Sequence, residues 1–310
     1  MWSDPPICGI DGPSVTGLAS RGRRGRRRCT VRSVRPDALA LRTGGPCDLD
    51  PEHLLDVVGE QRRRFVGVLD GFGPDDWAAP TRCAEWSAHD VVRHLCDANG
   101  IVHLGPGDRT LDVTAGFDPR TTPQARLAAS AAEQPGDTLA RLVATTEELL
   151  VVARGRLAEG RSFDVFLPFG AMDWTVLVLH GLWDAWIHER DVMLMRGTEH
   201  PSYDDATFYA TAYGLFLAAA VASVFAGDEV QEQLTLGGAG GGVFDVDTHG
   251  AVAVTARRVT VAGPPAAVFV DALAGRSPID DALASVGPGS RTALSRMADF
   301  FNTPVEQGSN

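Results

Sequence analysis

The chain has 310 residues, of which 44% are hydrophobic, and its formal net charge at neutral pH is -12. This length and hydrophobic content suffice for one large domain or two ordinary ones, which excludes a disordered or fibrous protein. The acidic balance argues against binding of the folded body to nucleic acid or anionic membranes. Five cysteines without a C-x-x-C pair also exclude a disulfide scaffold and a structural zinc knuckle.

The first 48 residues differ in composition from the rest of the chain. They are rich in Gly, Pro, Ser and Arg and show no apolar periodicity, so residues 1–48 are predicted to be a disordered extension. No apolar run of signal-peptide length follows the arginines at 21–28, which favours a cytoplasmic protein. A nucleic-acid-binding tail is the less favoured alternative, because the arginines lack interleaved aromatic residues.

From residue 49 to about residue 228 the apolar spacing is helical and predicts an antiparallel bundle. Ser87 and Asp90 have the spacing of a capping box at the start of the second helix, with Asp in place of Glu. Asp173 or Thr175 is expected to cap the fourth helix. The expected helices cover residues 51–72, 86–102, 135–157, 173–195 and 206–227.

Residues 206–227 (ATFYATAYGLFLAAAVASVFAG) carry no charge and are long enough to cross a bilayer. Most of the segment is Ala, Thr, Ser, Gly and Tyr, and alanine contributes little transfer free energy. We therefore predict a buried bundle helix rather than a transmembrane span.

Residues 229–306 have a different pattern. Alternating apolar and polar residues in EQLTLGG, GGVFDVD and AVAVTARRVTVAG predict half-buried strands, and PPAAVFVDALAG and SRTALSRMADFF predict two helices. A small α+β domain is expected here. The glycine-rich segment 237–242 is expected to connect strands, because a chain without lysine cannot satisfy the phosphate-loop signature.

The segment LHGLWDAWIHERDVML, residues 179–194, places His180, Asp184 and His188 four residues apart on one stripe of a helix. Successive members are separated by about 6 Å of helical rise, so one ion can reach ligands on two adjacent turns. The residues leave open whether His180 and Asp184 or Asp184 and His188 form the pair. His94, on another helix, is a candidate third ligand.

Two motifs resemble a known family. DDWAAPTRCAEWSAHDVVRHL (75–95) and DAWIHERD (184–191) resemble the mycothiol-dependent maleylpyruvate isomerases, within the DinB-like superfamily of metal-binding bundles. The resemblance implies that His94, Asp184 and His188 bind the metal, although the family usually has Glu at the position of Asp184. It also implies an α + α/β two-domain fold in which a DinB-like antiparallel helical bundle precedes a small α+β domain.

Residues 259–283 resemble the sterol-carrier-like C-terminal domain of the same proteins, with its characteristic Gly275 and Arg276. The whole resemblance covers roughly residues 50–305. It implies that Arg276 has a catalytic role, receiving a substrate carboxylate through its guanidinium.

The resemblance further implies a divalent ion, with zinc as the first choice, and mycothiol or a similar low-molecular-weight thiol as cofactors. The expected function is a metal-dependent isomerase or thiol transferase acting on a small electrophilic molecule, as a monomer or homodimer. The alternative is a noncatalytic protein that binds a metal or an apolar ligand. This alternative stays open because position 184 has aspartate where the family usually has glutamate.

Several nearby residues are expected to have other roles. His180 is predicted to be structural or to support the site, and Asp191 is predicted to face solvent rather than to orient His188. Cys96 is predicted to be a small buried group. Four tryptophans are expected in the core or in a pocket wall, namely Trp86, Trp174, Trp183 and Trp186.

Overall fold

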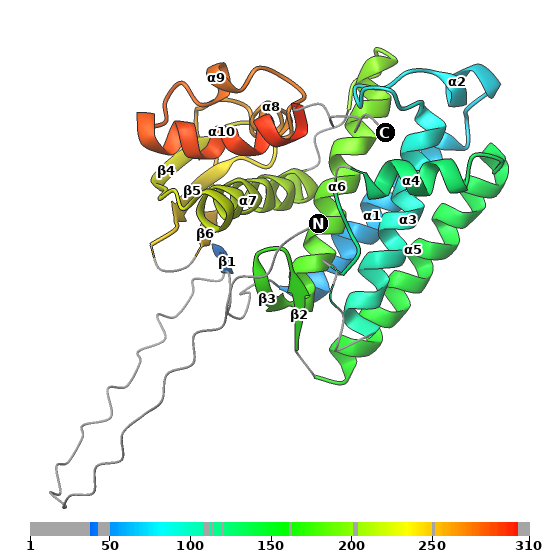
Figure 1. Ribbon diagram of the computed structural model, residues 1–310, viewed down its shortest axis with the longest axis horizontal. Coiled ribbons are helices and arrows are strands. Elements are labelled where there is room, and N and C mark those ends of the chain that lie inside the picture. Colours follow the sequence, from blue (N-terminus) through cyan, green and yellow to red (C-terminus); the bar gives the residue numbers. More distant parts are fainter. Residues whose placement is uncertain are drawn as a thin grey trace, which may run out of the picture. The chain divides into compact units, whose positions relative to one another are not determined.

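The protein is helix-rich, with two small antiparallel sheets (Figure 1). The computed structural model describes residues 38–42, 50–107, 112, 115–119, 121–160, 163–200, 204–249 and 252–302. The helices are α1 (Pro51–Leu69), α2 (Pro74–Ala78), α3 (Ala88–Gly107), α4 (Thr122–Ala129), α5 (Pro135–Ala158), α6 (Trp174–Met195), α7 (Asp204–Ala220), α8 (Ala266–Leu273), α9 (Ile279–Ala282) and α10 (Pro288–Asn302). All five helices predicted for the first part of the chain are present, and α2 and α4 are additional.

The helix starts follow the local sequence. The Asp50 carboxylate accepts hydrogen bonds from the backbone N–H groups of Glu52 and His53 at the start of α1. The predicted capping box is confirmed before α3, where Ser87 N donates to Asp90 Oδ2 (2.9 Å) and Asp90 N donates to Ser87 Oγ (3.2 Å). Asp173 caps α6 by accepting from the Thr175 N–H. These caps determine the position at which each helix begins.

Helix α3 packs against α5 and α6, and α1 packs against the same two helices. Most residues of α6 are buried, including polar ones, because it packs against α1, α3 and α7. Its side chains belong to both hydrophobic clusters of the described residues. Just before α6, strands β2 (Asp164–Leu167) and β3 (Gly170–Asp173) form a hairpin that was not predicted.

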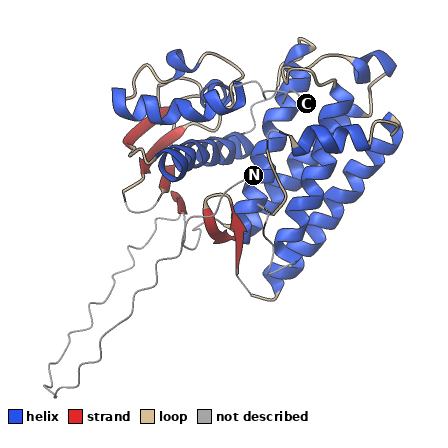
Figure 2. Cartoon of the chain, in the orientation of Figure 1, coloured by secondary structure: helices blue, strands red, loops and turns tan. Residues whose placement is uncertain are grey.

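The larger sheet, whose strands are among those drawn red in Figure 2, has the order β1-β6-β5-β4, with every neighbouring pair antiparallel. Its strands are β1 (Ala38–Arg42), β4 (Gln231–Leu236), β5 (Gly242–Asp247) and β6 (Ala253–Arg257). The glycine-rich segment 237–242 connects β4 to β5 and ends at the first residue of β5, as predicted. Gly240 has φ 70°, and a Cβ at this position would lie 2.5 Å from Thr207 Cβ, so both conformation and space require glycine here.

Strand β1 corrects the expectation of disorder up to residue 48. Residues 38–42 pair in register with β6, from Ala38 opposite Arg257 to Arg42 opposite Ala253. The short alternating segment ALALR satisfies backbone groups that an unpaired edge of β6 would expose. The rest of the predicted extension lies outside the described residues.

The apolar helix predicted at 206–227 is a buried helix of the protein. Residues Asp205–Phe225 are long and apolar enough to cross a membrane, but most of the segment is buried. It comprises α7 and a π-helical turn (Val221–Phe225) and packs against β1, β5, β6, α8 and α10. The chain from residue 35 onward forms one compact unit, so the domain boundary near residue 228 stays a prediction.

Candidate metal centre

His94 on α3 and the pair Asp184 and His188 on α6 converge at one place. His94 Nε2 lies 3.3 Å from Asp184 Oδ2, and His188 Nε2 lies 3.5 Å from Asp184 Oδ1. The ligand atoms of the three residues lie within 4.8 Å of one another. Ligands about 2.1 Å from a tetrahedral zinc ion are about 3.4 Å apart. The spacing of these atoms therefore suits a single ion.

Charge and burial also suit a cation at this position. Burial alone would raise the pKa of the Asp184 carboxyl, but the two imidazoles outweigh it and hold that pKa well below its usual range. The side chains of His94 and Asp184 are only 17% and 16% exposed. Asp184 is therefore an anion in a largely dry environment, with two nitrogen donors facing it.

His180 lies outside this group. Its Nδ1 is 3.0 Å from the Tyr213 hydroxyl oxygen on α7, and burial lowers the pKa of its imidazole. Of the two pairs that the helical spacing left open, the structure thus brings Asp184 and His188 together with His94. Helical periodicity could not separate these pairs, because the position of α3 along α6 decides which turns His94 faces.

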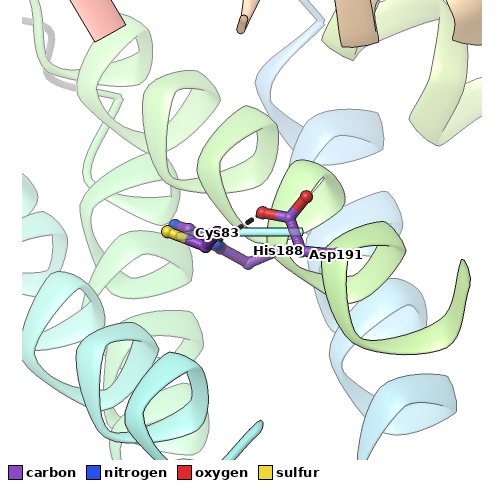
Figure 3. A group of neighbouring side chains, drawn as sticks. All are labelled: Cys83, His188 and Asp191. Carbon is purple, nitrogen blue, oxygen red and sulfur yellow. Dashed lines mark hydrogen bonds and ion pairs between the residues drawn. The ribbon is translucent and has the colours of Figure 1, made fainter. Parts of the chain in front are cut away.

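Asp191 does not face solvent, so that expectation is wrong. Its side chain is fully buried, and Oδ2 lies 3.1 Å from His188 Nδ1 (Figure 3). The Arg276 guanidinium donates to Asp191 through Nε and Nη2, and Arg82 Nε donates to Oδ1. Burial would raise the pKa of Asp191, but the contacts with His188 and Arg276 lower it to about 2. Segments far from α6 in the sequence cover this face of the helix. The sequence of α6 alone therefore cannot show that Asp191 is buried.

A second group of possible ligands overlaps the first. Ligand atoms of Cys83, His188 and Asp191 also lie within 4.8 Å of one another (Figure 3). Both Asp191 oxygens already accept hydrogen bonds, and an ion there would lie beside the guanidinium groups of Arg82 and Arg276. Burial raises the pKa of the Cys83 thiol to about 12. The group with His94 and Asp184 is therefore the better metal site.

Trp86 lies against the candidate ligands. Its ring centroid is 5.0 Å from that of His94 and 5.8 Å from that of His188, and its Nε1 donates to Gln124 Oε1 at 3.0 Å. It therefore forms a wall of the candidate centre. A pocket wall was one of the two places expected for the four tryptophans. Trp174 and Trp186 are fully buried in the core.

Arg276 and Cys96 can also be placed. Arg276 follows Gly275, which has φ 73°, and its Nη1 donates to the Ala274 carbonyl oxygen. Its other hydrogen bonds within the described part of the chain are with Asp191, so a role in receiving a substrate carboxylate stays a prediction. Cys96 is buried as expected, and burial raises its pKa to about 12.

Sequence reasoning missed Arg82, Cys83 and the role of Asp191. The motif at 75–95 contains the first two, but its apolar pattern indicates only where a helix starts. Their side chains lie at the centre because the segment between α2 and α3 turns back onto α6. The sequence did offer one signal for these residues. An arginine, a cysteine and a tryptophan lie within five positions just before the predicted capping box.

Comparison with known proteins relates this centre to a family. Residues 58–193, which contain His94, Asp184 and His188, match the family described as the mycothiol maleylpyruvate isomerase N-terminal domain. A crystal structure of the mycothiol-dependent maleylpyruvate isomerase is similar in fold, with a TM-score of 0.50 at 14% identity over 74% of this chain and 91% of that chain. A histidine-to-alanine mutant of a mycothiol-dependent maleylpyruvate isomerase gives 0.49 at the same identity and coverage.

A comparison with curated proteins finds no match. At 14% identity the crystal structure with the TM-score of 0.50 informs on the fold alone. The assignment therefore rests on the family match, which covers α6 up to Met193 and the whole of α3. The segment 58–193, and with it the candidate metal centre, belongs to the mycothiol maleylpyruvate isomerase N-terminal domain family.

Proposed function

We propose that this protein is a metal-dependent isomerase or thiol transferase that uses mycothiol or a similar thiol to attack a small electrophilic molecule. The observation that carries the proposal is the spacing of 3.3 and 3.5 Å between each imidazole Nε2 and an oxygen of Asp184. Two imidazoles and one carboxylate at this spacing are a donor set for a divalent ion, with zinc the first choice. The family match supports mycothiol as the thiol.

In this proposal His94, Asp184 and His188 hold the ion, which lowers the pKa of a coordinated thiol. The protein's own groups prepare the donors. Asp191 accepts from His188 Nδ1 at 3.1 Å, which leaves the Nε2 lone pair directed at the ion. Trp86 covers both imidazoles and limits the access of water. Arg276 is the proposed contact for a substrate carboxylate, which would share the guanidinium with Asp191.

The proposal includes the finer layout suggested by the sequence. We propose a DinB-like bundle over residues 49–228, followed by a sterol-carrier-like domain over residues 229–306. The antiparallel pairing of β4, β5 and β6 and their packing on α7 are compatible with such a small α+β domain. We further propose a cytoplasmic protein that acts as a monomer or homodimer.

A second candidate is a noncatalytic protein of the same fold that binds a metal or an apolar ligand. It is favoured by one feature of Asp184. Each of its two oxygens already faces one imidazole nitrogen, and the side chain is one methylene shorter than the usual glutamate. A carboxylate that reaches less far can hold the ion through a water molecule, and an ion held in this way need not activate a thiol.

Metal analysis of the purified protein tests the metal site. We expect about one equivalent of zinc in the unaltered protein and none in His94→Ala or His188→Ala. His180→Ala is the matched control, because it removes an imidazole from the same stripe of α6 but outside the group, and it should retain the metal. Retention of metal by either of the first two variants would remove that residue from the site.

Turnover distinguishes the two candidates. Isomerisation of maleylpyruvate with mycothiol present, which regenerates the thiol, and consumption of mycothiol by an alkylating electrophile would each be followed for the unaltered protein and for His188→Ala. Thiol-dependent turnover that is lost with the metal supports the enzyme. Stoichiometric metal without turnover of any electrophile would favour the binding protein.

A further inference from the structure

Arg82 lies in the segment 79–87 between α2 and α3, and it connects two distant parts of the chain. Its backbone N–H donates to the Asp191 carbonyl oxygen at 3.2 Å, and its Nε donates to Asp191 Oδ1 at 3.2 Å. Its two terminal nitrogens donate to the two carboxylate oxygens of Asp271 on α8, at 3.0 and 2.9 Å. One side chain therefore bridges α6 and α8, and only 17% of it is exposed.

We propose that Arg82 is a positioning residue for the metal centre. Arg82 holds both the Asp191 carboxylate, which orients His188, and the segment that carries Trp86. This inference rests on the proposed function, because it assigns a role to Arg82 in the same centre. Arg82 touches none of His94, Asp184 and His188 through any contact that the described residues show. It acts through Asp191 and through its own backbone.

The first route runs from Arg82 through Asp191 to His188. Asp191 Oδ2 lies 3.1 Å from His188 Nδ1, so this carboxylate sets the plane of the imidazole and the nitrogen that carries the proton (Figure 3). A carboxylate behind a metal-binding histidine typically has this role. Arg276 donates to both oxygens of Asp191, from Nε to Oδ1 at 3.1 Å and from Nη2 to Oδ2 at 3.0 Å, and Arg82 Nε adds a second donor to Oδ1. The two guanidinium groups together prevent rotation of the carboxylate.

The second route runs along the segment 79–87. Thr81 N donates to the Trp86 carbonyl oxygen at 3.2 Å, and Trp86 N donates to the Cys83 carbonyl oxygen at 3.1 Å. Glu85, inside this turn, has φ 69°, a conformation that a residue with a side chain rarely adopts. Such a turn persists when its ends are held. Arg82 anchors it to α6 and α8, so the anchor also sets where the Trp86 ring meets the two imidazoles.

Replacement of Arg82 should leave a folded protein. Asp191 would still accept from Arg276, and Asp271 would still accept from Arg190, whose Nη2 lies 2.6 Å from Asp271 Oδ2. Within this group of three guanidinium ions and two carboxylates, removal of one guanidinium leaves two of each. No buried carboxylate loses its last cationic partner, which is the change that most strongly destabilises a buried pair.

The experiment compares Co²⁺ binding by the unaltered protein, Arg82→Gln and Arg82→Lys. We expect the dissociation constant of Co²⁺ to rise about tenfold in Arg82→Gln, at the low end of the effect of groups behind the ligands. Arg82→Lys should recover part of the affinity. Arg64→Gln is the matched control. Arg64, on α1, pairs with the buried Glu189, which lies on α6 next to His188 in sequence. Its affinity should change less than twofold.

A spectroscopic signature separates positioning from general destabilisation. In the Co²⁺ protein the His188 Nδ1 proton should give a strongly shifted NMR signal. The rate at which this proton exchanges with water would report how firmly Asp191 holds it. The exchange should be faster in Arg82→Gln and unchanged in Arg64→Gln. Circular dichroism would verify that each variant is folded.

Three outcomes would overturn the inference. The first is an unchanged Co²⁺ affinity and proton exchange in folded Arg82→Gln and Arg82→Lys, which would leave the proposed function intact. The second is an equal loss of affinity in Arg64→Gln, which would show a general effect of buried ion pairs on α6. The third is failure of the unaltered protein to bind Co²⁺, which would overturn the proposed function and this inference together.

Discussion

Replacement of Asp191 by asparagine tests the electrostatics of the candidate centre. The pKa of Asp191 falls from its ordinary value of 3.8 to about 2 in the folded protein, where His188 and Arg276 outweigh the effect of burial. A tenfold change in proton affinity is worth about 1.4 kcal/mol. The ionised carboxylate therefore stabilises the folded protein by about 2 kcal/mol at neutral pH, and Asp191→Asn should lose this amount.

The sign of the pH dependence follows from the lowered pKa. A carboxyl with a lower pKa in the folded than in the unfolded state stabilises the protein above pH 3.8, and this contribution is lost as the pH falls to about 2. At pH 3 about half of it should remain. The difference between the unaltered protein and Asp191→Asn should therefore shrink on acidification.

The assay is urea unfolding followed by tryptophan fluorescence at pH 7 and pH 3, with a chelator present so that metal binding does not contribute. With an m-value of about 3 kcal/mol per M, the midpoint at pH 7 should fall by about 0.7 M. Asp56→Asn is the control, since that exposed side chain pairs with the exposed Arg154 and with no other cation among the residues that the structure describes, and its effect should stay below about 0.5 kcal/mol. A loss in Asp191→Asn as small as the control, or equally large at both pH values, would refute this reasoning.

Three further predictions concern other parts of the structure. Gly240→Ala should destabilise the folded protein by about 3 kcal/mol in thermal unfolding, because the new Cβ would meet the backbone of α7. Gly116→Ala, with φ 70° but no atom nearby, should cost about 1 kcal/mol, and equal losses in the two variants would contradict this. Burial raises the pKa of Cys83 to about 12, so peptide mapping after iodoacetamide treatment at neutral pH should find this thiol modified only in denatured protein, and rapid alkylation of the native protein would show the thiol to be activated. Co²⁺ should quench tryptophan fluorescence less in Trp86→Phe than in Trp77→Phe, because Trp86 packs on His94 while Trp77 packs on Phe72 and His89; equal quenching would place the ion elsewhere.

The sequence predicted much of the local structure because helix periodicity and caps depend on residues within one or two turns. Asp50, the Ser87 and Asp90 pair and Asp173 cap their helices by hydrogen bonds to neighbouring backbone groups. The strands after residue 228 followed from alternation in the same way. Strand β1 was missed because five residues carry too little pattern, and their hydrogen-bond partners lie more than 200 positions further along the chain.

In the candidate site, too, the local sequence predicted one part and contacts between distant segments decided the other. The amino-acid sequence alone determined that Asp184 and His188 share a helical stripe and offered His94 as a candidate third ligand, and the family resemblance favoured these three residues as the set. Only the tertiary structure decided that His180 lies outside this group and that Asp191 lies behind His188, clamped by Arg82 and Arg276. The physical reason is that the pattern along a helix reports which face is buried, whereas the charged groups that cover this face come from segments whose approach depends on the packing of the whole fold.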